Sequence, residues 1–139
     1  MYMPPPVVIN YLAVLAATVL SNVLGMLWYG PLFGKVWMKA TGKSMADMKK
    51  GGSPMMSMSL NAVAILVLAY VLAHFIQYAG AKTPVDGMIA GFWVWLGFVA
   101  TTSLATYLFE GRNIKLYYIY MGYQLVSLLL MGALLAAWI

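Results

Sequence analysis

Four long apolar segments separated by short polar ones dominate the pattern of the chain. They cover approximately residues 7–29, 54–78, 84–109 and 114–138. A helix of about 20 apolar residues crosses the roughly 30 Å hydrocarbon core of a bilayer, so each segment is long enough to span a membrane. The pattern predicts an all-α bundle of four transmembrane helices that forms a single domain over residues 1–139. No basic residue precedes the first segment, which is also too long for a signal peptide, so we expect it to be retained.

The first span is expected to end at Gly30-Pro31, because proline cannot continue a helix without losing a hydrogen bond. Beyond it, apolar residues fall on one side of a helix and lysines spaced four apart fall on the other, which predicts a short amphipathic helix in the membrane surface over about 32–40. Gly42 is expected to end that helix. The residues assigned to the membrane interface are Trp28, Tyr29, Phe33, Lys35, Trp37 and Lys39.

Polar residues followed by proline mark the starts of the next two spans. Ser53-Pro54 and Thr83-Pro84-Val85-Asp86 each combine an N-cap residue with proline in the first turn. Ser44 and Asp47 have the spacing of a capping box, which predicts a brief additional helix before Gly51-Gly52.

The composition agrees with a membrane protein. Hydrophobic residues make up 64% of the 139 residues and charged residues only 8%, with a mean hydropathy of +0.87. A soluble domain carries roughly 25% charged residues. Seven of the eight Lys and Arg residues lie in the first and third connecting segments. This asymmetry predicts that these segments are cytoplasmic and that both termini are outside, and it favours an anionic lipid surface over nucleic acid as the partner.

Several motifs resemble those of a known family. They are the Trp28-Tyr29-Gly30-Pro31-Leu32-Phe33-Gly34-Lys35 core, Asn10 to Leu15, Trp95-Leu96-Gly97-Phe98 and Gly122-Tyr123-Gln124. The chain resembles, over nearly its whole length, a group of small prokaryotic membrane proteins catalogued as a domain of unknown function. The resemblance implies a four-helix membrane protein and implies no activity, substrate or cofactor, and we expect it in the cytoplasmic membrane of a prokaryotic cell.

Small residues recur every four positions on two helix faces. Such faces allow close approach of another helix in lipid. The residues are Ala13, Ala17, Ser21 and Gly25 in the first span and Gly87 and Gly91 in the third. They favour a non-catalytic structural or accessory subunit that packs against other membrane chains, of the same or a different kind.

Polar groups inside the membrane are costly and each requires a reason. The candidates for a solute path are Asn22, Asn61 and Gln124. Such a path would make the protein a small transporter or channel whose path forms between protomers. The three residues are too sparse to form a continuous polar stripe. His74 is expected at the outer interface, bonded to water or a carbonyl, and Glu110 and Arg112 are expected to fix the geometry of a turn.

Methionine is concentrated around the first connecting segment. Thioether sulfur is a soft ligand that suits Cu(I), which gives a weaker alternative of copper handling through Met45, Met48, Met55, Met56 and Met58. The chain contains no Cys, and no His lies near this cluster, so we expect no bound metal. Glycine-rich phosphate loops, paired acids and metal-ligand spacings are also absent from the sequence, so we expect neither a cofactor nor enzymatic activity.

Overall fold

The computed structural model describes residues 6–42 and 54–138, and this part of the chain forms helices and no strands. Four helical segments are long and apolar enough to cross a membrane, which confirms the predicted fold class. In chain order the elements are α1 (Tyr11–Leu27), η1 (Trp28–Leu32), α2 (Gly34–Thr41), α4 (Pro54–Tyr78), α5 (Pro84–Val94), η2 (Trp95–Ala100), α6 (Thr101–Glu110) and α7 (Ile114–Ala137). The elements η1 and η2 are wide π-helical turns that continue the α-helices before them.

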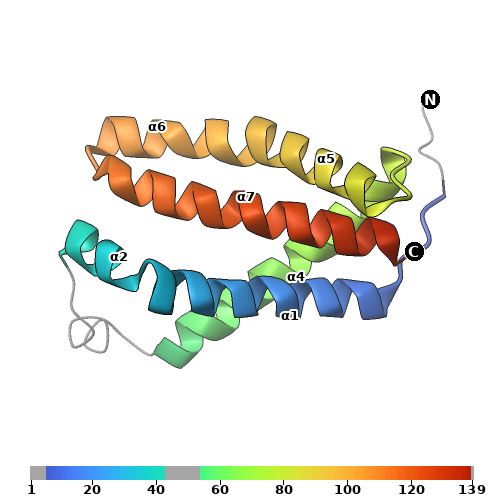
Figure 1. Ribbon diagram of the computed structural model, residues 1–139, viewed down its shortest axis with the longest axis horizontal. Helices are drawn as coiled ribbons and strands as arrows, with labels where there is room; N and C mark the ends of the chain where they lie inside the picture. The colour runs from blue at the N-terminus through green and yellow to red at the C-terminus, as the bar shows by residue number, and fades with distance from the viewer. Residues whose placement is uncertain (1–5, 43–53, 139) are drawn as a thin grey trace.

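Helix α7 is the centre of the bundle. It lies between α1 on one side and the α5–α6 segment on the other, with α4 crossing behind (Figure 1). In the most apolar 18-residue stretch of α7, 50% of the residues are buried within the chain. The corresponding stretch of the third span, Pro84–Glu110, has only 11% of its residues buried. The third span therefore packs along α7 and presents most of its surface to its surroundings.

The contact between α5 and α7 depends on glycine. A Cβ atom on Gly87 would overlap the carbonyl oxygen of Gly132, and one on Gly132 would overlap the carbonyl oxygen of Gly87. A Cβ on Gly91 would likewise overlap the carbonyl of Leu128. The backbones of the two helices are thus in direct contact, and this small-residue face is occupied inside the chain.

The small-residue face of α1 is also used inside the chain. Ala13, Ala17 and Ser21 are 1%, 0% and 2% exposed. Ser21 Oγ lies 2.7 Å from Ser127 Oγ and 3.0 Å from the Tyr123 hydroxyl, which in turn donates to the Ser21 carbonyl at 2.9 Å. Since each hydroxyl has one hydrogen, Ser127 donates to Ser21 and Ser21 donates to Tyr123. This chain of buried hydrogen bonds connects α1 to α7.

Helix ends follow local capping chemistry. The Asn10 side chain accepts a hydrogen bond from the Ala13 N–H at 3.2 Å, so α1 begins at Tyr11 and not at residue 7. Thr83 and Asp86 form a capping box at the start of α5. Gly42 has a φ of 71° and ends α2, as predicted. Residues 44 and 47, for which a further capping box was predicted, lie outside the described residues.

The expectation that Gly30-Pro31 ends the first span was wrong. Because Pro31 has no N–H, the α-helical bond to the Leu27 carbonyl cannot form, and the helix widens into η1. The Trp28 carbonyl then accepts from the Phe33 N–H at 2.8 Å, and the helix reaches Leu32. The break comes at Phe33, and α2 begins at Gly34, where a Cβ would lie 2.7 Å from the Tyr29 carbonyl oxygen.

Candidate functional site

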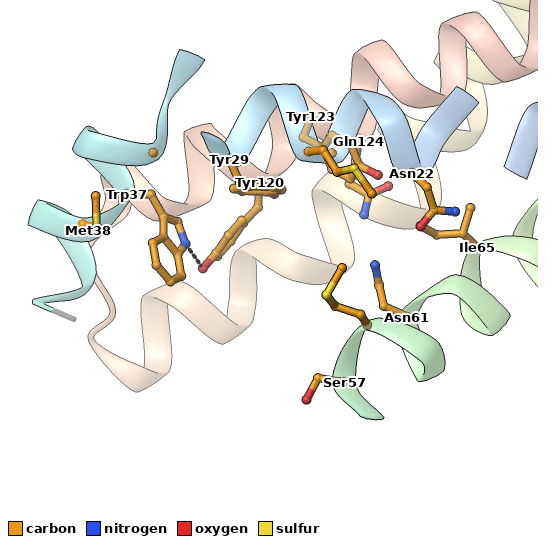
Figure 2. A pocket seen from close by; sticks show the side chains of 14 residues that line it. Asn22, Tyr29, Trp37, Met38, Ser57, Asn61, Ile65, Tyr120, Tyr123 and Gln124 are labelled. Carbon is orange, nitrogen blue, oxygen red and sulfur yellow. Dashed lines mark hydrogen bonds between the residues drawn. The ribbon is translucent and has the colours of Figure 1, made fainter. Parts of the chain in front are cut away.

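A pocket of about 610 Å³ lies between α1, η1, α2, α4 and α7, and we call it the amide pocket (Figure 2). Its size is within the range of sites that bind small molecules. The residues that line it are Asn22, Gly25, Met26, Tyr29, Gly34, Trp37, Met38, Ser57, Met58, Asn61, Ile65, Tyr120, Tyr123 and Gln124. Residues far apart in the sequence therefore share one cavity.

Three side-chain amides from three helices face this space (Figure 2). Asn22 donates from Nδ2 to the Thr18 carbonyl at 2.8 Å, which leaves its side-chain oxygen available. Asn61 and Gln124 make no hydrogen bond to the part of the chain that the structure describes. Both amides are accessible from the pocket. The pocket thus offers several donors and acceptors to a ligand.

The amide pocket reaches deep into the bundle. Gln124 lies ten residues after the start of α7 at Ile114, a rise of about 15 Å along the helix. That is about half of a 30 Å hydrocarbon core. Trp37 and Ser57 line the end of the pocket nearer to the α2–α4 connection. The cavity therefore extends from one end of the bundle to about its middle.

Aromatic rings form one wall of the pocket. The ring centroid of Tyr29 lies 5.8 Å from that of Tyr120 and 5.4 Å from that of Tyr123. Trp37 Nε1 donates to the Tyr120 hydroxyl at 2.8 Å, shown by the dashed line in Figure 2. The hydrogen of the Tyr120 hydroxyl itself takes part in no hydrogen bond among the described residues, so it can be donated to a ligand.

The described lining of the pocket contains no charged side chain. Lys35 and Lys39 on α2 are exposed and are not among the lining residues. The described lining therefore offers neutral amides, hydroxyls, rings and thioethers.

A comparison with protein families gives a match over residues 12–136. The chain belongs to the family described as protein of unknown function (DUF1761). Comparisons with curated proteins and with solved structures gave no match. The expected family relationship is thus established, and the family description names no activity.

In this DUF1761 protein three of the four aromatic residues assigned to the membrane interface contact α7, namely Trp28, Tyr29 and Trp37. Trp28 donates from Nε1 to the Ile119 carbonyl at 3.0 Å, and the Phe33 ring lies 4.7 Å from the Trp28 ring. Tyr29 and Trp37 line the amide pocket. These rings therefore pack η1 and α2 onto the bundle. The exposed members of the predicted interface set are Lys35 and Lys39.

His74, Glu110 and Arg112 lie away from the pocket. His74 Nδ1 is 2.9 Å from the Tyr70 carbonyl one turn earlier in the same helix, and its ring meets the Tyr70 ring edge to face. Arg112 Nε forms an ion pair with Glu110 at 2.8 Å across the turn at Gly111, which has a φ of 67°. Both partners are about half exposed, so the pair contributes little to stability and is typical of a surface turn.

The methionine cluster is only partly within the described chain. Met55 and Met56 are exposed, Met58 lines the amide pocket, and Met45 and Met48 lie outside the described residues. Among described residues, no group of three His, Cys, Asp or Glu side chains is placed to hold a metal ion.

Sequence reasoning identified the three amides but not their convergence. Ser57, Met26 and Met38 were not singled out, because a hydroxyl or thioether in an apolar segment is common. The one available signal was the presence of Asn and Gln within spans, where unpaired amides are costly.

Proposed function

We propose that this protein is a small membrane transporter or channel and that the amide pocket is its substrate site. The observation that supports the proposal is the convergence of Asn22, Asn61 and Gln124 on one cavity that reaches about the middle of the bundle. Substrate sites of secondary transporters lie near the bilayer midplane, at junctions between helices. The site is built within one chain; completing a path to the other side would require a neighbouring protomer or a movement of helices.

Folding does not explain the amides of Asn61 and Gln124. An amide placed in a bilayer is costly unless it is hydrogen-bonded, and these two bond no described residue. A helix requires neither side chain, since apolar residues at both positions would serve α4 and α7 equally well. A role in binding a polar solute accounts for both.

Solute flux in vesicles tests the proposal. Purified protein is reconstituted into liposomes, and the uptake of urea, acetamide and nicotinamide is followed by stopped-flow light scattering. We expect flux of at least one solute above protein-free vesicles, and a loss of about tenfold with Asn61→Leu and with Gln124→Leu. Thr102→Val is the matched control, because this exposed hydroxyl bonds only carbonyls of its own helix, at Phe98 and Val99. Flux that survives both pocket substitutions, or that never exceeds protein-free vesicles, would contradict the proposal.

A second candidate is a non-catalytic accessory subunit of a membrane complex. It is favoured by the outer face of the third span, where Gly97, Thr101 and Ala105 are exposed and a Cβ on Gly97 would meet nothing within 4 Å. Small residues permit close helix contact, and the other two small-residue faces are occupied within the chain. Gly97→Leu should then reduce the size of the complex in mild detergent, measured by light scattering; an unchanged mass would argue against this candidate.

A further inference from the structure

We infer that the amide pocket binds an uncharged, planar ligand that carries both a hydrogen-bond donor and an acceptor, as an aromatic amide does. The inference rests on the proposed role of the pocket as a ligand site and adds the chemical class of the ligand.

The first argument concerns hydrogen-bonding groups. Asn61 and Gln124 each bring an N–H₂ donor and a carbonyl acceptor, and Asn22 brings its carbonyl acceptor and the one N–H that does not bond the Thr18 carbonyl. A ligand with only acceptors or only donors would leave half of these groups unpaired in a cavity at membrane depth. A ligand amide presents both kinds of group side by side and satisfies a protein amide with two hydrogen bonds.

The second argument concerns shape. Tyr29, Trp37 and Tyr120 line the cavity on one side, and thioethers of Met26, Met38 and Met58 contribute further polarizable surface. Aromatic rings and methionine sulfur contact planar ligands favourably through stacking and edge contacts. The Trp37–Tyr120 hydrogen bond of 2.8 Å holds these two side chains relative to one another, so this part of the wall is preformed.

The third argument concerns charge. The described lining contains no Asp, Glu, Lys, Arg or His. A charged ligand in a cavity of low dielectric would lose its hydration without gaining a counter-charge from the described lining, which is strongly unfavourable. A neutral ligand avoids that penalty. Together the three arguments select an uncharged planar amide over a carboxylate or an ammonium of the same shape.

Three probes of nearly equal shape separate these cases. Benzamide is neutral, benzoate is an anion and benzamidinium is a cation. Binding of each to the full-length protein in lipid nanodiscs is measured by equilibrium dialysis. We expect benzamide to bind about tenfold or more tightly than either ion. Asn61→Leu and Gln124→Leu should each weaken benzamide binding by about tenfold, while Thr102→Val should leave it unchanged.

The outcomes are distinct from those of the flux experiment. Equal or tighter binding of benzoate or benzamidinium would overturn the inference, as would an absence of binding of all three probes. Benzamide binding that is insensitive to both pocket substitutions would also overturn it. Benzamide binding without any solute flux would support the ligand class and contradict transport. Solute flux without preferential binding of benzamide would support transport and contradict the ligand class.

Discussion

At the scale of single residues, the glycines of the third span differ in what surrounds them. Gly87 faces the backbone of α7, while Gly97, which follows later in the same span, has open space where a side chain would be. Both are helical, so an alanine gains about 1 kcal/mol in helix propensity at either position. The sign of the net effect therefore depends on packing alone.

We expect Gly87→Ala to destabilise the protein and Gly97→Ala to leave it unchanged or slightly more stable. The methyl group at position 87 would overlap the Gly132 carbonyl oxygen and force α5 away from α7, at a cost of about 2 kcal/mol or more. Thermal unfolding in detergent, followed by circular dichroism, measures both variants. Equal melting temperatures for the two would show that the close helix contact contributes nothing.

At the scale of helices, a side-chain hydrogen bond and the residues around the amide pocket connect α2 to the bundle. It is eight residues long, begins directly after the break at Phe33 and ends at Gly42. Its Trp37 makes the side-chain hydrogen bond to Tyr120 on α7, and its Met38 and Trp37 line the amide pocket. A short helix cannot be stable alone in water, so its position depends on these contacts.

Trp37→Phe should loosen α2 while the bundle stays folded. The substitution keeps an aromatic ring but removes the hydrogen bond to Tyr120, which contributes about 0.5–1.5 kcal/mol. Amide hydrogen exchange of residues 34–41 should accelerate by roughly two- to tenfold. Trp93→Phe is the control, because Trp93 is 62% exposed on α5. Unchanged exchange in α2 would mean that other contacts hold this helix.

At the scale of the whole molecule, the four spans were predictable, because hydropathy over a membrane-spanning length is a property of local sequence. The start of α5 was predictable for the same reason, since Thr83 and Asp86 cap it within one turn. The amide pocket was not predictable. Asn22, Asn61 and Gln124 belong to three helices, and only the packing of these helices brings their side chains to one cavity. The π turn at Pro31 was also missed, because the Gly-Pro pair indicates a missing N–H without showing whether the helix stops or widens.

The distribution of charge predicts the orientation of the molecule. Seven of the eight Lys and Arg residues lie in the first and third connecting segments or within two residues of them, so we expect these segments to face the cytoplasm and both termini to lie on the opposite side of the membrane. The chain has no cysteine, so single cysteines at Lys39 and Lys82 can be labelled without background. An impermeant thiol reagent should label position 82 on intact cells and position 39 only after lysis. Labelling of position 39 on intact cells would reverse the assignment.

The central position of α7 has a consequence for how the protein is made. At about 5–20 residues per second, α7 emerges from the ribosome roughly 5 to 20 seconds after α1. Until then Ser21 has neither of its α7 partners, and Gly87 and Gly91 have no helix against them. The first three spans therefore remain without their contacts to α7, in the bilayer or beside an insertase, until α7 is inserted. A nascent chain interrupted before α7 would keep these faces open, and membrane proteases that recognise loosely packed helices would have time to remove it.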